Sequence, residues 1–306
     1  VGQKHLSIPL PAELYGQLRA NSKGLDLAND SALIHLNQTA QQFAKHQWSA
    51  APMGEHIQTN DAVAPQSIIN PARHSDVVGY VQEATTEQVE QALNNAQAVQ
   101  DIWARTAKDT RASYLLRAAD LMEARLEELM VLLCRESGKT YANAIAEVRE
   151  AVDFLRYYAT QMIDLDANAE VEPLGTMLCI SPWNFPLAIF TGQVAAALVA
   201  GNTVIAKPAE QTPLIAAQAI QILWQAGVPQ AAVQLMPGRG ETVGAQLSAA
   251  EQVQGIMFTG STEVAKILQK TVAKRLSKTG ESIPLIAETG GQNAMIVDSS
   301  LSLIHI

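Results

Sequence analysis

The second half of the sequence alternates short apolar runs with longer segments of helical periodicity, and this alternation constrains the fold most. The apolar runs are "TMLCI", "TVIA", "AVQLM", "GIMF", "PLIA" and "AMIVD", and helix-like segments of about 9 to 16 residues follow the first four. Short strands that alternate with helices form β-α-β units, in which the strands run parallel and helices cover both faces. Residues 174–300 therefore predict a doubly wound α/β domain around a parallel sheet.

The residues before 174 predict a different organisation. Residues 1–65 are polar and irregular, with helical candidates around 31–48, so we expect an N-terminal arm. "SIINPARHSDVVGYV" (67–81) predicts two short strands around an Asn-Pro turn. Because three long helical segments follow, we expect 66–173 to be mainly helical.

Each of these three helices has a recognisable pattern. Thr85 and Gln88 form a capping box at the start of a helix that reaches Trp103. Two further helices are predicted over roughly 110–136 and about 141–163. In the second helix the leucines expected to face the core are Leu116, Leu121, Leu129 and Leu133.

Composition excludes several classes of function. The formal net charge of −9 argues against nucleic-acid binding, and no run of about 18 apolar residues predicts a membrane span. The six histidines show no ligand spacing, so no metal site is expected. The two cysteines, Cys134 and Cys179, stand in apolar contexts, exclude a disulfide framework and fit a reducing compartment such as the cytoplasm.

Polar and glycine-rich segments follow five of the predicted strands. Ligands of doubly wound sheets bind at the carboxyl ends of the strands, so these segments are the candidate site. They are "SPWNFP" (181–186), "KPAE" (207–210), "PGRGETVG" (237–244), "FTGS" (258–261) and "ETGG" (288–291).

Each segment has a structural and a functional interpretation. The G-x-G-x-x-x-G pattern of 238–244 is either a turn packed on a helix or a nucleotide-binding loop. Ser261 is either a simple helix cap or a pyrophosphate contact at a helix N-terminus. Lys207 is either a solvated surface lysine or a ligand of ribose hydroxyls. Asn184 stands between aromatic residues, where its amide should be hydrogen-bonded, in a structural role or as a donor to an oxyanion.

Together these segments resemble one family. "PWNFP", "KPAEQTP", "GRGETVG", "FTGSTEVA" and "ETGGQN", with "NPARHSDVVG" and "ESGKT" upstream, are similar to the aldehyde dehydrogenase superfamily over roughly 66–300. "LRANSKGLDLAND" (18–30) resembles a narrower branch, the bacterial proline utilization A proteins, which also carry a flavin-dependent proline dehydrogenase module. This resemblance implies NAD-dependent oxidation of L-glutamate γ-semialdehyde, formed from pyrroline-5-carboxylate, to L-glutamate. It also implies a Rossmann-like NAD-binding domain over 174–300, with 66–173 as the helical part of the NAD-binding half.

The resemblance also assigns roles to individual residues. Asn184 is implied as the oxyanion donor, and Glu288 as the base that activates water, for which a poorly solvated position is expected. Lys207 and Glu210 are implied to hold the adenine ribose, where the carboxylate disfavours the extra phosphate of NADP. The full set implied to contact NAD is Ile180, Ser181, Pro182, Trp183, Lys207, Glu210, Gly240, Gly244, Phe258, Gly260, Ser261, Thr289 and Gly290.

One role of the family has no counterpart in this sequence. The nucleophilic cysteine lies in a G-Q-x-C context beyond the glutamate, and neither that motif nor the catalytic domain is present. Cys134 and Cys179 are expected to be buried structural thiols. The sequence also lacks an initiator Met. We therefore expect it to be part of a longer, oligomeric protein. "LSLIHI" (301–306) is expected to be a non-native tail. An inactive NAD-binding fragment and a dehydrogenase for another aldehyde remain as alternatives.

Overall fold

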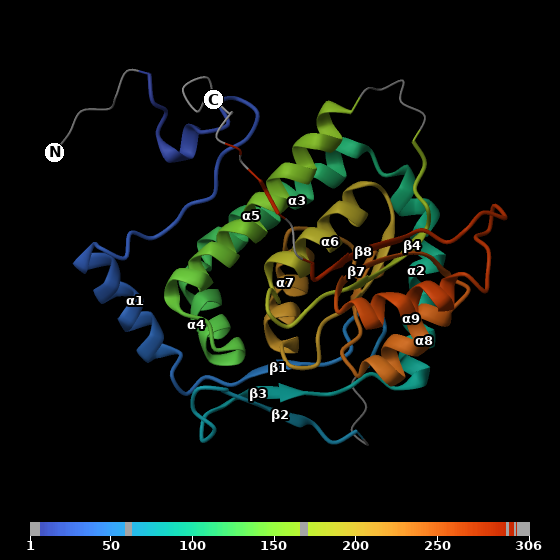
Figure 1. Ribbon diagram of the computed structural model, residues 1–306, viewed down its shortest axis with the longest axis horizontal. Coiled ribbons are helices and arrows are strands. Elements are labelled where there is room, and N and C mark those ends of the chain that lie inside the picture. Colours follow the sequence, from blue (N-terminus) through green and yellow to red (C-terminus); the bar gives the residue numbers. More distant parts are fainter. Residues whose placement is uncertain (1–6, 59–62, 166–170, 292–293, 297, 299–306) are drawn as a thin grey trace.

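The computed structural model describes residues 7–58, 63–165, 171–291, 294–296 and 298, so the predicted tail 301–306 lies outside the described residues. Its centre is a five-stranded parallel sheet in the order β6-β5-β4-β7-β8 (Figure 1). The strands are β4 (Thr176–Ile180), β5 (Thr203–Lys207), β6 (Val233–Leu235), β7 (Val253–Gly260) and β8 (Leu285–Thr289). The predicted doubly wound α/β fold is confirmed.

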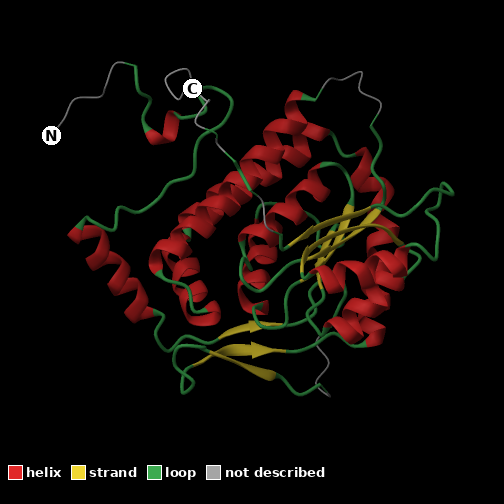
Figure 2. Ribbon diagram, in the orientation of Figure 1, coloured by secondary structure: helices red, strands yellow, loops and turns green. Residues whose placement is uncertain are grey.

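Helices cover both faces of this sheet because alternate strand residues are apolar on each side. On β4, Met177 and Cys179 face one core and Leu178 faces the other. The first core includes α6 (Ala188–Val199) and α7 (Pro213–Gln225), and the second is formed with α2 (Thr86–Arg105), α8 (Ala245–Ala249) and α9 (Thr262–Val272). Figure 2 shows the resulting helix-sheet-helix layers.

A second, three-stranded sheet joins the N-terminal segment to the body. Its order is β1-β3-β2, with β1 (Trp48–Ala50) parallel and β2 (Gln66–Ile69) antiparallel to β3 (Val77–Val81). The two strands predicted within 67–81 are confirmed. The helical candidate at 31–48 was too long, because α1 (Asp30–Gln42) ends early and Trp48 and Ala50 are buried on one side of a strand.

The helices between residues 86 and 164 agree with prediction except that one predicted helix is interrupted. The capping box of Thr85 and Gln88 is present at the start of α2. The helix predicted over 110–136 is two helices, α3 (Lys108–Ala124) and α4 (Leu126–Ser137), because the chain turns at Arg125 (φ −103°, ψ 18°). α5 (Tyr141–Asp164) follows Gly138, which ends α4 in the left-handed conformation. Of the leucines predicted to face the core, Leu129 and Leu133 are buried and Leu121 is partly buried, whereas Leu116 is exposed and its neighbour Leu115 is buried instead.

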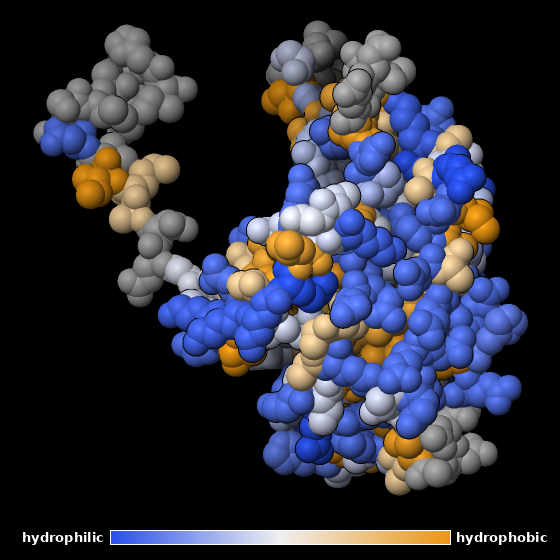
Figure 3. Space-filling view, turned by 90° about the vertical axis from the view of Figure 1, so that its right-hand side faces the viewer, coloured by the Kyte–Doolittle hydropathy of each residue, from blue (hydrophilic) through white to orange (hydrophobic). Residues whose placement is uncertain are grey.

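Figure 3 shows a face that is largely hydrophilic, with separate apolar patches. No helix among the described residues is both long and apolar enough to span a membrane. The strand predicted at "AMIVD" was wrong: residues 294–296 and 298 form no strand, and Met295 and Ile296 are both 91% exposed. An apolar run needs a neighbouring strand to complete its hydrogen bonds, and none of the described residues provides one there.

Candidate nucleotide and aldehyde site

The central sheet has a topological switch point at β4. β5 and β6 extend the sheet on one side of β4, whereas β7 and β8 extend it on the other. The connection that follows β4 leads to β5 on one side, whereas the connection that follows β7 leads to β8 on the other side. Where two adjacent strands have connections in opposite directions, a crevice opens at their carboxyl ends. Here these ends are Ile180, in β4, and Phe258 to Gly260, in β7.

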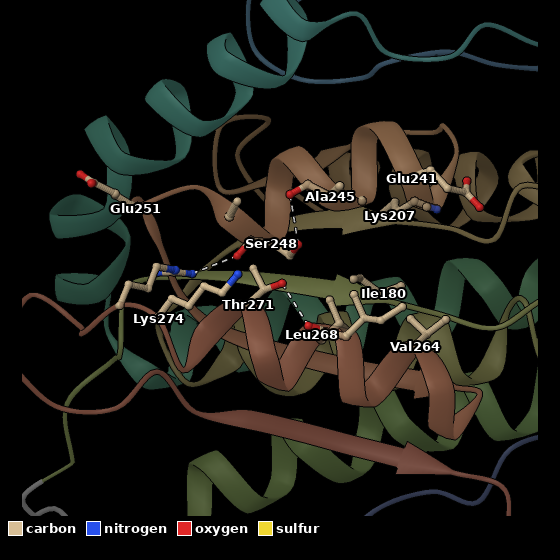
Figure 4. Close-up of a pocket in the computed structure, with 15 residues that line it drawn as sticks. Ile180, Lys207, Glu241, Ala245, Ser248, Glu251, Val264, Leu268, Thr271 and Lys274 are labelled. Carbon is tan, nitrogen blue, oxygen red and sulfur yellow. Dashed lines mark hydrogen bonds between the residues drawn. The ribbon is translucent and has the colours of Figure 1, made fainter.

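A cavity of about 760 Å³ lies beside this point, between α8 and α9 (Figure 4). Its size is that of a pocket for a small organic ligand. Four residues predicted to contact NAD line it: Ile180, Lys207, Gly240 and Gly244. The other wall residues are Glu241, Ala245, Ser248, Ala249, Glu251, Val264, Ile267, Leu268, Thr271, Lys274 and Arg275.

The lysine of this cavity is buried. Lys207, the last residue of β5, is only 4% exposed, and its Nζ donates a hydrogen bond to the carbonyl oxygen of Pro208 (3.1 Å). Burial lowers the pKa of Lys207, and the nearby carboxylates of Glu210, Glu241 and Glu83 oppose that effect. A solvated surface lysine is therefore excluded, and the ammonium group is set among carboxylates at the end of the cavity.

The glycine motif serves a turn and the cavity wall together. A Cβ at Gly238 would lie 2.4 Å from Cγ2 of Val243, so only glycine fits this turn. Gly240 begins and Gly244 ends a π-helical turn (Gly240–Gly244) that leads into α8. The backbone N–H of Gly240 donates to Oε1 of Glu210 (2.7 Å), which ties the loop after β6 to the loop after β5.

Ser261 caps α9. Its hydroxyl oxygen accepts the backbone N–H of Val264 (3.2 Å), as a simple cap does. Gly260, just before it, packs against Phe258, because an added Cβ would lie 2.5 Å from the ring. The pyrophosphate contact of Ser261 stays a prediction.

The loop after β4 places Asn184 in solvent rather than in the apolar setting expected. Trp183 (56% exposed), Asn184 and Phe185 (41% exposed) are all exposed, and among the described residues nothing hydrogen-bonds the Asn184 side chain. The expectation of a hydrogen-bonded amide was wrong because the two aromatic neighbours themselves face outward. The backbone carbonyl of Asn184 is held, however, by Nζ of Lys139 (2.8 Å).

Glu288 lies on the outermost strand and is exposed, so the expected poorly solvated position was not found. β8 pairs with β7 on one edge, and no described strand covers the other. Glu288 lines a second cavity of about 390 Å³, together with Gln193, Phe258 and Thr259. In this cavity Nε2 of Gln193 donates to the hydroxyl of Thr259 (3.0 Å), which is paired in register with Glu288.

The remaining predicted contacts stay predictions. Ser181, Pro182 and Trp183 follow β4 at the same sheet edge, while Thr289 and Gly290 lie exposed at the end of β8. Sequence reasoning missed the cavity walls on α8 and α9. The sequence feature that could have indicated them is a row of side chains at helical spacing on α9, Val264, Ile267, Leu268 and Thr271, that line the cavity. Two of these apolar residues, Val264 and Ile267, remain 41% and 61% exposed.

Neither cysteine is placed to act as a nucleophile. Cys179 lies in β4 at 1% exposure, and burial raises the pKa of its thiol. Burial also raises the pKa of Cys134, in α4, to about 11, although the charge of Lys139 opposes this. Because the thiolate is the reactive form, both are structural thiols. The predicted burial is confirmed for Cys179, whereas Cys134 is only partly buried.

A doubly wound sheet with a ligand-sized cavity at its switch point defines an α/β domain of Rossmann-like class. Residues 57–304 match the model of the aldehyde dehydrogenase family. The chain belongs to this family.

Several relatives are similar over most of the chain. The bifunctional protein PutA of Escherichia coli K12 is 60% identical over 299 residues, which are 98% of this chain and 22% of that protein. The 1-pyrroline-5-carboxylate dehydrogenase of Anoxybacillus flavithermus is 36% identical over 90% of this chain and 55% of its own. This chain thus spans between about a fifth and about half of these relatives.

Solved structures of related proteins have a similar fold. The crystal structure of proline utilization A from Bdellovibrio bacteriovorus, inactivated by N-propargylglycine, has a TM-score of 0.82 at 31% identity, and covers 89% of this chain and 30% of its own. A 1-pyrroline-5-carboxylate dehydrogenase from Thermus with bound NAD has a TM-score of 0.82 at 32% identity, over 89% of this chain and 55% of its own.

Proposed function

We propose that this chain is the NAD-binding part of a longer enzyme that oxidises L-glutamate γ-semialdehyde to L-glutamate. The observation that carries the proposal is the cavity at the switch point, which has both apolar and polar walls and a buried lysine at one end. The identity with PutA and with 1-pyrroline-5-carboxylate dehydrogenases supports the choice of aldehyde. In a bifunctional parent, a proline dehydrogenase module in the same polypeptide would generate this aldehyde from proline.

The residues of the cavity fit NAD. The apolar part of the wall, formed by Ala245, Val264 and Leu268, suits a flat purine ring. The ammonium of Lys207 with the carboxylate of Glu210 suits ribose hydroxyls. A 2′-phosphate would meet Glu210 and Glu241, so the site favours NAD over NADP. When bound, NAD accepts the hydride that leaves the aldehyde carbon.

The chain's own residues act on the other atoms of the reaction. The amide of Asn184 donates a hydrogen bond to the oxyanion formed when a thiolate attacks the aldehyde. Once that adduct has lost its hydride it is a thioester; Glu288 takes a proton from the water that attacks this thioester, and the acid and the free thiol are released. The thiolate comes from the longer protein, because neither thiol here is suited to the attack.

The aldehyde is tested on the full-length protein by comparing kcat/KM for L-glutamate γ-semialdehyde and for succinate semialdehyde. We expect L-glutamate γ-semialdehyde to be favoured at least tenfold. A preference for succinate semialdehyde would reject the proposed substrate while leaving the dehydrogenase chemistry in place.

The burial of both thiols favours a second candidate for the isolated chain, which is an NAD-binding segment without catalysis. It predicts that the 306-residue chain binds NAD but produces no NADH from the aldehyde. Formation of NADH by this chain alone would exclude that candidate.

A further inference from the structure

The loop that carries Asn184 is held from both sides by one buried ion pair. Nζ of Lys139 lies 2.7 Å from Oε2 of Glu147, and their side chains are only 12% and 0% exposed. Lys139 directly follows Gly138 at the end of α4, and Glu147 lies in α5. The pair therefore belongs to the helical layer and not to the nucleotide cavity.

Lys139 contacts the middle of the loop, at Asn184 and Phe185. Its Nζ donates to the backbone carbonyl of Asn184 (2.8 Å) and lies 4.6 Å from the ring centroid of Phe185. An ammonium group has three N–H donors, and Lys139 directs this group at Glu147, the carbonyl of Asn184 and the ring of Phe185. Cys134 and Glu150 also lie within reach of its charge. The peptide unit of Asn184 is thus oriented by its carbonyl, which leaves the side-chain amide exposed and available.

Glu147 holds the C-terminal end of the same loop. Oε1 of Glu147 accepts the backbone N–H groups of Leu187 (2.7 Å) and Ala188 (3.3 Å) at the start of α6. A carboxylate at the N-terminus of a helix is stabilised by these donors and by the helix dipole. The loop between β4 and α6 is consequently fixed at residues 184 and 187–188 by two side chains that attract each other.

We propose that Lys139, supported by Glu147, is a positioning residue that orients Asn184 toward the oxyanion. The inference rests on the proposed function, because it assumes that Asn184 stabilises the reacting oxygen. A donor misplaced by about 1 Å can reduce the rate about 100-fold, so a catalytic amide on an exposed loop needs an anchor of this kind.

A double-mutant cycle in the full-length protein tests this role. NADH formation from L-glutamate γ-semialdehyde is measured at saturating NAD for the wild type, Lys139→Met, Asn184→Ala and the double variant. We expect kcat to fall about 10- to 100-fold for Lys139→Met and about 100- to 1,000-fold for Asn184→Ala. Because both changes remove the same interaction, the double variant should be no slower than Asn184→Ala alone.

Two further variants separate positioning from general damage. Lys139→Arg keeps the charge and the donors, so it should recover at least part of the lost kcat. Glu136→Gln is a matched control, because Glu136 is also a buried carboxyl that accepts two backbone N–H groups at a helix start, at Leu214 and Ile215, away from this loop. It should keep kcat, and all folded variants should keep the NAD dissociation constant within about twofold.

The possible outcomes have distinct meanings. A wild-type kcat in Lys139→Met, or losses that multiply in the double variant, would overturn the role of Lys139. If Lys139→Met does not fold, Glu147→Gln takes its place in the cycle, because it removes the charge that holds the lysine. Absence of NADH from the wild type would instead reject the proposed function itself.

Discussion

The buried carboxyl group of Glu136 should make the free energy of unfolding depend on pH. Glu136 lies in the last turn of α4 at 4% exposure and accepts the backbone N–H groups of Leu214 (2.7 Å) and Ile215 (2.9 Å). Burial, the largest effect, raises the pKa of Glu136 to about 8, the two hydrogen bonds lower it, and the charge of Glu147 raises it.

The sign follows from which state holds the proton. Between the ordinary glutamate value of 4.5 and about 8, the folded protein binds the proton of Glu136 more tightly than the unfolded chain does. The free energy of unfolding therefore falls as the pH rises through this window and levels off above it. At about 1.36 kcal/mol per pH unit, the contribution of this group falls by at most about 3 kcal/mol between pH 6 and pH 8.

Urea unfolding of the wild-type chain and of Glu136→Gln, followed by tryptophan fluorescence from about pH 6 to pH 9, measures this effect. Since the other titrating groups are shared, the difference between the two proteins isolates Glu136. We expect the wild type to lose up to about 3 kcal/mol relative to the variant as the pH rises. At pH 6 the variant should be less stable by about 1 to 3 kcal/mol, because its amide NH₂ cannot accept the N–H of Ile215. Parallel stability curves would refute the reasoning.

Three further substitutions probe the cavity and its loops. Lys207→Met should weaken NAD binding about tenfold or more, because it removes a charged donor, and a fluorescence titration that finds unchanged affinity would contradict this. Glu210→Ala should narrow the NAD/NADP affinity ratio, whereas an unchanged ratio would show that the carboxylate is not the selector. Gly238→Ala should lower the free energy of unfolding by about 1 to 3 kcal/mol, because its Cβ would lie 2.4 Å from Val243. The matched control Gly290→Ala, whose Cβ would meet nothing within 4 Å, should leave stability unchanged.

Much of the fold could be predicted because the strands of the central sheet are nearly continuous apolar runs. Buried parallel strands require such runs, and glycines such as Gly138 and Gly201 mark the helix ends. The predictions failed where tertiary contacts decide whether a helix continues or ends. Periodicity alone does not show that the guanidinium of Arg125 bonds Glu128 (2.8 Å) and Gln218 (2.6 Å) at the break between α3 and α4.

The site was predictable only where a residue type is forced by the backbone or by the family motifs. The loops after each strand carry glycine, proline and isolated polar residues, which stand out in a sequence. Glu136 and Glu147 do not, because charged residues in helices are usually solvated, and only the packed structure shows that each lies under the start of another helix. Solvation of Glu288 likewise depends on what covers β8, which its own sequence does not encode.

The most direct test of the account is the time course of NADH formation by full-length Glu288→Gln mixed rapidly with NAD and L-glutamate γ-semialdehyde. If Glu288 only activates water, hydride transfer should still occur once, giving a burst that approaches one NADH per active site. Turnover after the burst should then fall at least about 100-fold relative to the wild type. Steady turnover at the wild-type rate, or a variant that binds both substrates but shows no burst, would contradict the assignment of Glu288 as the base for thioester hydrolysis.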